Sequence, residues 1–390
     1  MKKAISILLA IVLVFALAAC GEKKDDTKPA QSPSGSSAPA TTSSAPATTS
    51  AAPANPSASA AAPEVSSGDE NKYPWNPANI RSQHFILAHG MAPENVVSKC
   101  YHAFCEYVKE LSDGKMEIEE MINGTLLKDL DTFNGLRDGT ADFIHSMGSY
   151  VSSTVVDLSP LTIAGYYGGD DWLDFAFGTK DLVSQIYADY NIKYLGALYQ
   201  GTSVIACSEK QIKQPGDVKG LPWRASGDWV IKTIEAWGGA ATNISLPNLA
   251  DAFQKGTVVG VTTGWTIIGG WGIWEVAKYL TTTDICEGFA ALLMNGDVWA
   301  KLNADEQALL EYAGDMFVRN NFELTKVACQ EYYDKIKAEG KNELYQLPAA
   351  DNRKFIEIAY SLYPEMEAGG TLGSKGLELI KILRRYNGIS

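Results

Sequence analysis

The residue of this chain best suited to binding a small anion is Arg224, which lies near the end of the segment QIKQPGDVKGLPWRAS at residues 211–226. The QPGD portion is typical of a turn, and Asp217 is expected to cap the short helical turn that follows. Gly220 ends that turn, so the LPWR portion is predicted to be extended. An arginine at a strand end, beside small residues, can bind a carboxylate through two hydrogen bonds. The alternative is an ordinary ion pair, at the surface or between domains.

The other residue types that support chemistry are too scattered to define a site. The chain contains four histidines, and five of its six cysteines lie beyond Cys20 without a CxxC spacing. An odd number of cysteines cannot be wholly paired within one chain. Cys100 and Cys105 are five residues apart on a predicted helix, so their side chains point in different directions and buried free thiols are expected. We therefore expect neither a metal site nor a cofactor.

The sequence also lacks the motifs of common enzymes. It has no GxSxG, HExxH or P-loop pattern and no Cys/His nucleophile frame. The paired acids Asp170 and Asp171 lie in a polar loop, where solvation is the simpler interpretation. The formal net charge is -13 and no lysine or arginine cluster offsets it, so a nucleic-acid partner is not expected. These features favour a binding protein over an enzyme.

The first residues have the pattern of a secretory signal peptide. Lys2 and Lys3 precede an apolar run at residues 5–17, which is shorter than the roughly 20 residues that a membrane-spanning helix needs. The run ends in LAACG, which resembles a bacterial lipobox. The resemblance implies a signal peptide at residues 1–19, cleavage before Cys20 and a lipid on the Cys20 thiol. The alternative is a plain signal peptide with an incidental cysteine.

A segment rich in Ala, Pro, Ser and Thr follows the lipobox. It has almost no large apolar side chain between Glu22 and about Glu70, so it cannot bury enough surface to offset the entropy lost on ordering. We interpret residues 20–80 as a lipidated, disordered tether. About 310 residues remain after it, enough for two α/β lobes that each have a core.

The folded part begins with alternating strand and helix patterns. Strands are predicted at residues 84–89, 116–119 and 142–146, and helices at residues 95–111 and 130–137. This βαβαβ order favours a parallel sheet with a ligand crevice at the carboxyl ends of its strands. Later strands are predicted at residues 194–198, 204–207, 258–263 and 289–294, and later helices at residues 179–190, 229–237, 248–253, 303–339, 350–359 and 375–386.

Several segments, taken in order, resemble the TRAP-transporter substrate-binding proteins (the DctP-like family). The LPWR segment is similar to the family's "TP-EDLKGLKIR", and NGTLL, GLRDGTADF and WEVAKYLT match further landmarks. The resemblance implies a two-lobed α/β fold of the periplasmic-binding-protein type II, with a long helix spanning both lobes. Asn303 and Glu306 form a capping-box pattern at the start of that helix. The expected lobes are residues 81–205 with 288–330, and residues 206–287 with 331–390.

The resemblance also implies which positions face the crevice. In the family the arginine at the position of Arg224 pairs with the carboxylate of an organic acid. Other matched positions have lost the family's polar or charged residue, since Met147 replaces an acid of some members and Thr263 an asparagine. Trp265 shares strand parity with Thr263 and is expected to face the crevice, whereas Trp223 points opposite Arg224. The remaining expected ligand-binding positions are His89, Ser203 (a second arginine in several members), Leu246 and Asn248 (a glutamate in the family).

With Arg224 as the one remaining charge, the expected ligand is a small organic monoanion. It would carry one carboxylate or sulfonate and an apolar or aromatic body, because a second buried charge would be left unpaired. The family implies delivery of this ligand to TRAP membrane permease subunits by an extracytoplasmic protein, here held to the cell membrane through lipid on Cys20. An ABC-importer binding lipoprotein with a different small ligand is the alternative, and a sensor kinase is a further possible partner.

Overall fold

The structure is a computed structural model that describes residues 73–163, 166–167, 171–283, 285–286 and 288–389. The predicted signal peptide, Cys20 and most of the predicted tether lie outside these residues. All described residues belong to one compact unit. None of the helices in this part of the chain is both long enough and apolar enough to cross a membrane.

The first of two large sheets has five strands in the order β2-β1-β3-β12-β5. β1 is parallel to both β2 and β3, which confirms the predicted βαβαβ unit. The sheet as a whole is mixed, because β12 enters it antiparallel to β3 and β5. The strands are β1 (Gln83–Ala88), β2 (Met116–Met121), β3 (Phe143–Met147), β5 (Ile192–Leu198) and β12 (Ala290–Asn295).

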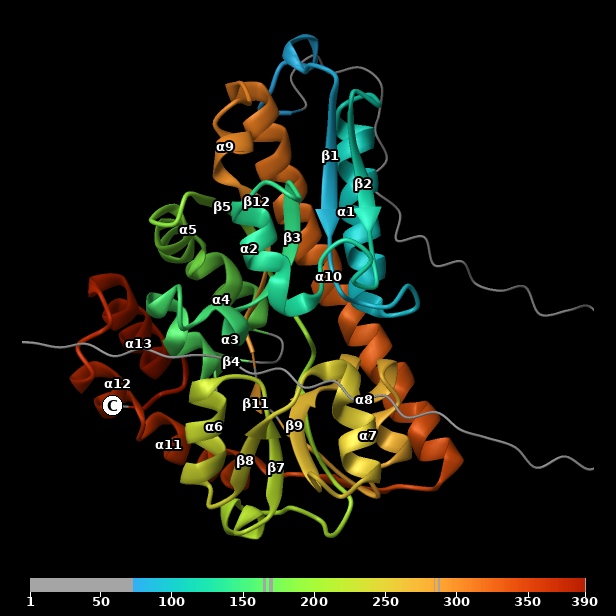
Figure 1. Cartoon of the computed structure of the whole chain (residues 1–390), viewed down its shortest axis with the longest axis vertical. Coiled ribbons are helices and arrows are strands. Elements are labelled where there is room, and N and C mark those ends of the chain that lie inside the picture. Colours follow the sequence, from blue (N-terminus) through green and yellow to red (C-terminus); the bar gives the residue numbers. More distant parts are fainter. Residues whose placement is uncertain (1–72, 164–165, 168–170, 284, 287, 390) are drawn as a thin grey trace, which may run out of the picture. The chain divides into compact units, whose positions relative to one another are not determined.

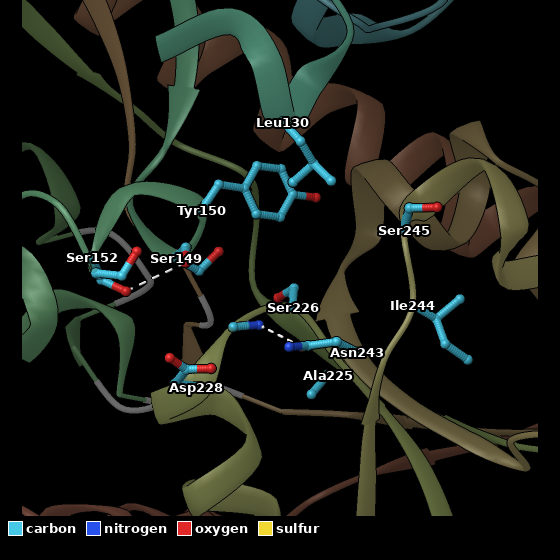
Figure 2. Close-up of a pocket in the computed structure, with 12 residues that line it drawn as sticks. Leu130, Ser149, Tyr150, Ser152, Ala225, Ser226, Asp228, Asn243, Ile244 and Ser245 are labelled. Atoms are coloured by element: carbon cyan, nitrogen blue, oxygen red, sulfur yellow. Dashed lines mark hydrogen bonds between the residues drawn. The ribbon is translucent and has the colours of Figure 1, made fainter. Parts of the chain in front are cut away.

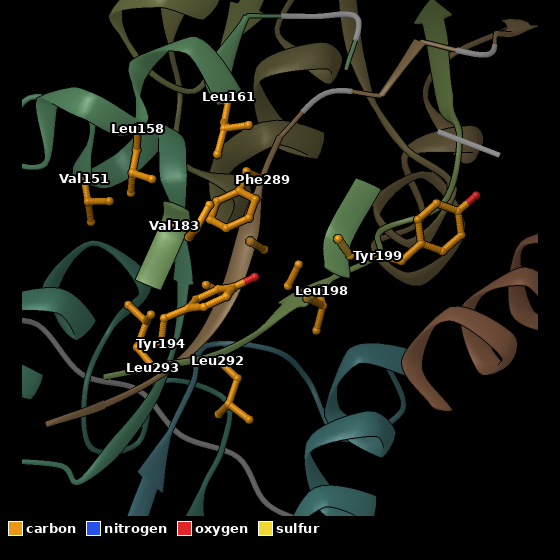
Figure 3. Packing of buried hydrophobic residues seen from close by; sticks show 14 of the residues in the cluster. Val151, Leu158, Leu161, Val183, Tyr194, Leu198, Tyr199, Phe289, Leu292 and Leu293 are labelled. Atoms are coloured by element: carbon orange, nitrogen blue, oxygen red, sulfur yellow. The ribbon is translucent and has the colours of Figure 1, made fainter. Parts of the chain in front are cut away.

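Helices cover this first sheet and close its apolar core. Asn95 caps α1 by accepting a hydrogen bond from the backbone N–H of Val97. Figure 3 shows part of the core, where Leu158 and Val183 belong to the same apolar cluster as Tyr194 and Phe289. The elements on this side are α1 (Val96–Leu111), η2 (Asp129–Asp131), α2 (Thr132–Arg137), α3 (Gly148–Val151), η3 (Val156–Thr162), α4 (Trp172–Gly178), α5 (Lys180–Ala188) and α9 (Gly296–Trp299).

The second large sheet has six strands in the order β13-β10-β6-β9-β7-β8. Its strands are β6 (Ser203–Cys207), β7 (Pro222–Ala225), β8 (Ala240–Asn243), β9 (Gly260–Gly264), β10 (Tyr279–Thr282) and β13 (Glu343–Gln346). The short elements around it are η4 (Pro215–Val218), α6 (Asp228–Ala236), η5 (Leu246–Asn248), α7 (Leu249–Gln254), α8 (Trp265–Gly270) and η6 (Ile273–Glu275). A separate pair, β4 (Tyr166–Tyr167) and β11 (Ile285–Cys286), completes the strands of the described part. We call the part built on the first sheet lobe I and the part built on the second sheet lobe II.

One long helix, α10 (Ala304–Glu339), contacts both lobes (Figure 1). It packs on α1 and β5 of lobe I and on α8 of lobe II. The predicted capping box is confirmed, since the Asn303 side chain accepts hydrogen bonds from the N–H groups of Asp305 and Glu306. The Glu306 carboxylate in turn accepts a hydrogen bond from the N–H of Asn303. The predicted helix that spans both lobes is therefore present.

Both ends of the folded part differ from the predicted boundaries. Tyr73 and Trp75 stack against each other and contact Tyr312 of α10, so the packed chain begins before residue 81. The C-terminal helices are α11 (Ala349–Tyr360), α12 (Tyr363–Ala368) and α13 (Ser374–Tyr386). The assignment of all three to lobe II is wrong for α13, which packs on η3 and α5 of lobe I because its buried apolar face meets theirs.

Four of the cysteines, Cys100, Cys105, Cys207 and Cys329, are free thiols. Cys100, Cys105 and Cys207 are buried, as predicted, and Cys329 is partly exposed. Burial raises the pKa of the Cys100 thiol to about 12, so this side chain stays protonated and unreactive at neutral pH.

Candidate ligand-binding site

Arg224 lies on β7 with its side chain turned away from the core. The strand forms as predicted, whereas the turn before it is capped differently, because Gln214 is the N-cap of η4. Asp217 lies at the third position of that turn, and its carboxylate accepts the backbone N–H groups of Lys213 and Gln214. The neighbouring Trp223 is fully buried in the core, which agrees with the predicted alternation along the strand.

The guanidinium of Arg224 is buried but is not matched by a carboxylate. The residue is 6% exposed, and its Nε donates a hydrogen bond to the carbonyl of Ile244 at 3.0 Å. This bond fixes the plane of the guanidinium. Arg224 takes part in none of the ion pairs formed between residues that the structure describes. The interpretation of Arg224 as one half of an ordinary ion pair is therefore not supported among these residues.

Arg224 faces an inner cavity of about 40 Å³ between the two lobes. Its walls are mostly apolar, with hydroxyl and amide groups at a few positions, and Arg224 is the only charged side chain among the described residues that line it. The lining residues are Met91, Met147, Ser149, Tyr150, Thr162, Gln200, Arg224, Ser226, Val230, Leu246, Thr263, Ile267 and Gly288. The cavity therefore offers one positive charge against an apolar surround.

Tyr150 lines the inner cavity beside Arg224. Burial raises the pKa of its phenol, whereas the charge of the Arg224 guanidinium and a side-chain hydrogen bond to it oppose this shift, and the Asp129 carboxylate adds to it. Because the pKa is raised overall, the phenol stays neutral. Burial also raises the pKa of Asp129, which neither lines the cavity nor forms an ion pair with Arg224.

Figure 2 shows the residues that line a second, outer cavity of about 320 Å³. Ser149, Tyr150 and Ser226 line both, so they form a neck between the two spaces. The outer cavity is rich in hydroxyl and amide groups. Its other lining residues are Leu130, Ser152, Ser153, Ala225, Gly227, Asp228, Asn243, Ile244 and Ser245.

The expected site residues divide into two groups. Met147, Leu246 and Thr263 line the inner cavity together with Arg224, and the Sδ of Met147 lies 2.9 Å from the Nε2 of Gln200. His89, Ser203, Asn248 and Trp265 do not line it. Asn248 is exposed, and its amide bonds the Ser245 hydroxyl at 2.9 Å. Ser203 is fully buried within the second sheet, and its carbonyl accepts a hydrogen bond from Thr283.

His89 belongs to the core of lobe I rather than to the cavity. Its ring is fully buried and stacks on Tyr101 with the centroids 5.1 Å apart. Burial lowers the pKa of His89 to about 4, so it is neutral at physiological pH. The Tyr101 hydroxyl also bonds the Nδ1 of His145, whose pKa is lowered to about 3, chiefly by burial. The histidine that follows the first strand is thus part of an uncharged buried cluster.

Trp265 differs from the expectation because the strand that carries Thr263 ends at Gly264. Trp265 opens helix α8 instead, and the alternation of side chains along a strand no longer applies to it. Its ring meets Tyr333 of α10 edge to face and lines a different cavity, beside Cys329. The aromatic group of the inner cavity is Tyr150.

Sequence reasoning missed several residues of the two cavities, including Ser149, Tyr150, Gln200 and Ser226. Ser149 and Tyr150 lie in α3, two and three residues after the end of β3, and Ser226 follows directly after β7. The rule that ligands bind at strand ends points to all three positions.

Among the described residues, no group of three or more His, Cys, Asp or Glu side chains is arranged to hold a metal ion.

Comparison with known proteins places these features in a family. The family model of the bacterial extracellular solute-binding proteins, family 7 (DctP), matches residues 87–369. The chain is 22% identical over 66% of its length to the ectoine-binding periplasmic protein TeaA of Halomonas elongata, and this alignment covers 76% of TeaA. It is 22% identical over 73% of its length to the C4-dicarboxylate-binding protein DctB of Bacillus subtilis, of which 82% is covered.

A further relative and a solved structure agree with this match. A solute-binding protein of Roseobacter denitrificans is 22% identical over 52% of this chain, and the chain spans 63% of that relative's length. The solved structure of the Halomonas elongata ectoine-binding protein superposes with a TM-score of 0.71 at 21% identity, covering 78% of this chain and 99% of the other. Because the family model matches well over half of the sequence, this chain belongs to the bacterial extracellular solute-binding proteins of family 7, the DctP family.

Proposed function

We propose that this protein captures a small organic monoanion in the inner cavity and delivers it to the membrane subunits of a TRAP-type transporter. One observation carries the proposal. Arg224 is buried, faces the cavity and has no carboxylate partner among the described residues. A buried charge without a partner is costly, so an anionic ligand would complete the pair.

The number of charges determines the class of acid. A ligand with one carboxylate or sulfonate is matched by Arg224, whereas the second charge of a dicarboxylate finds no further cation among the described residues that line either cavity. The side chains of Met91, Val230, Leu246 and Ile267 favour an apolar or aromatic body. The relatives named above bind different solutes, ectoine for TeaA and C4-dicarboxylates for DctB, so membership of the family alone does not select the ligand.

A thermal-shift screen of residues 72–390 against small organic acids tests the proposal. A ligand that binds only the folded protein adds about 2.7 kcal/mol of stability at 100 times its Kd, which moves the melting temperature clearly. We expect hits among monocarboxylates that disappear in Arg224→Ala. Hits confined to dicarboxylates, or hits that survive Arg224→Ala, would contradict the proposed site.

We also propose that lipid on Cys20 holds the protein at the outer face of a cell membrane. The lipobox-like LAACG sequence supports this anchor. The unaltered chain is expected to remain with the membrane fraction, and Cys20→Ala to be released. Equal partition of the two proteins would contradict the anchor.

A further inference from the structure

The Ser149 hydroxyl is buried without a hydrogen-bond partner among the described residues. Ser149 is 7% exposed, and its Oγ is one of the few buried side-chain oxygens of the described part that bond to nothing. Only its backbone carbonyl is used, as acceptor for the Ser152 hydroxyl at 3.3 Å. Because buried hydroxyl groups in proteins are normally paired, this one needs an explanation.

The position of Ser149 indicates what its partner is. Together with Tyr150 and Ser226, it lines both the inner and the outer cavity and so forms the neck between them (Figure 2). Lobe II approaches closely at this point, since a Cβ added to Gly227 would lie 2.8 Å from the carbonyl oxygen of Ser149. A ligand that occupies both cavities would therefore lie beside the unpaired hydroxyl.

The inner cavity is much smaller than the outer one, at about 40 Å³ against about 320 Å³. A ligand whose carboxylate binds Arg224 and whose apolar part contacts the inner walls can therefore extend past Ser149 into the larger outer cavity.

We propose that the ligand spans both cavities and carries a hydrogen-bonding substituent, such as a hydroxyl or oxo group, that Ser149 binds at the neck. This inference rests on the proposed function, because it needs the carboxylate on Arg224. It narrows the ligand class from monocarboxylates in general to monocarboxylates substituted along their chain. The outer cavity suits the far end of such a molecule, since Ser152, Ser153, Asn243 and Ser245 offer further hydroxyl and amide groups.

Pairs of acids that differ by one polar group test the inference on the unaltered protein. We would measure Kd by calorimetry for mandelate and phenylacetate, and for 3-hydroxybutanoate, 4-hydroxybutanoate and butanoate. At least one substituted acid is expected to bind about tenfold more tightly than its unsubstituted partner, as one additional hydrogen bond predicts. Equal affinities within every pair would overturn the inference, although the proposed function would stand if binding still required Arg224.

Two matched serine variants assign the effect to one hydroxyl. In Ser149→Ala the ratio of the affinities for the substituted and the unsubstituted acid is expected to fall toward one. Ser146→Ala is the control, because the Ser146 hydroxyl is also buried and unpaired among the described residues but lines neither cavity. A preference that survives in Ser149→Ala, or that is lost equally in Ser146→Ala, would contradict the role of Ser149. If no acid binds the unaltered protein, the proposed function itself fails.

Discussion

Glu306 and Arg224 are two buried charges of opposite sign that the fold treats differently. Glu306 is fully buried at the start of α10 and accepts hydrogen bonds from the Nε and Nη2 of Arg81 at 2.8 and 2.5 Å. It also accepts the backbone N–H groups of Arg81 and Asn303. Burial acts to raise the pKa of Glu306, yet these hydrogen bonds lower it to about 2. The fold supplies every partner that this carboxylate needs.

Arg224 is almost as deeply buried, but its hydrogen-bond partners in the described part of the chain, the Ile244 carbonyl and the Tyr150 phenol, are both uncharged. The difference distinguishes two uses of a buried charge. A buried charge that pairs with an opposite charge of its own chain stabilises the fold. A buried charge that has no such partner and lines a cavity can bind an oppositely charged ligand. Removing Arg81, the partner of Glu306, should reduce the stability of the fold, and removing Arg224 should reduce ligand binding.

The largest expected effect is on binding by Arg224→Ala. Affinity for a monocarboxylate hit should fall by about 100-fold or more, roughly 3 kcal/mol, because the ligand's charge is left buried without a partner. The free energy of unfolding without ligand should be unchanged or higher, since an uncompensated buried cation is removed. Calorimetry and urea denaturation give the two quantities. Arg224→Lys keeps the charge but not the planar fork, so it should restore only part of the affinity.

The opposite pattern is expected for Arg81→Ala. The buried Glu306 carboxylate loses its principal donor, so the melting temperature should fall by about 3 to 6 °C. Ligand affinity should stay the same, because neither residue lines a cavity. Arg353→Ala is the matched control, since Arg353 pairs with Glu357 through side chains that are both half exposed and should matter little. A large loss of ligand affinity in Arg81→Ala would contradict the prediction that the Arg81–Glu306 pair contributes to stability alone.

A third kind of buried group, the neutral histidine, should make the protein sensitive to acid. The pKa values of His89 and His145 are lowered from 6.5 to about 4 and about 3. As the pH falls, these histidines are protonated in the unfolded chain before they are protonated in the folded protein. Their contribution to the free energy of unfolding is therefore fully present above pH 6.5 and is lost as the pH falls toward 4. The expected loss is about 2 kcal/mol for each histidine between pH 6.5 and 5.

Urea denaturation across this pH range measures the effect, and His89→Phe should reduce the slope. The Glu306 carboxylate acts in a lower window, since its pKa falls from 4.5 to about 2 and its contribution is lost only below pH 4.5. His102→Gln is the control, because the side chain of His102 is mostly exposed. If His89→Phe and the unaltered protein show the same slope, the buried histidine does not titrate as described.

The smallest effect is expected at Gly227, where lobe II meets Ser149. Gly227 has φ +142°, and a Cβ would also press on the Ser149 carbonyl oxygen. Gly227→Ala should therefore cost about 1 kcal/mol of stability from backbone strain and weaken ligand binding as well. Gly220→Ala is the matched control, with φ +74° but no heavy atom within 4 Å of the added Cβ. Equal losses of binding in the two variants would show that strain, and not the approach of the lobes, is responsible.

The sequence was a good guide to the elements because their patterns are local. The helix at residues 95–111 and the capping box at Asn303 follow from side chains that lie within a few residues of one another. The packing of α13 on lobe I was not predictable in this way. It depends on where an apolar helix face finds a partner far away in the chain.

The site was predictable where a residue type and a strand end coincide, as at Arg224. It was not predictable where the outcome depends on the residue at which a strand stops. Trp265 lies outside the expected site because β9 ends at Gly264 and Trp265 begins helix α8, and His89 because its side chain is buried in the core after β1. Tyr150 follows a strand end, but the sequence does not show that its side chain lies beside Arg224 from the other lobe.

Helix α10 is held at both of its ends, and this has a mechanical consequence. Its first turn is fixed to lobe I through Arg81 and Glu306, and the strand that follows its last turn, β13, is paired with β10 of lobe II. A helix of 36 residues is about 54 Å long. A rotation of one lobe against the other would therefore have to bend or twist α10. The stiffness of α10 would oppose such a rotation and favour the return of the two lobes to their starting arrangement.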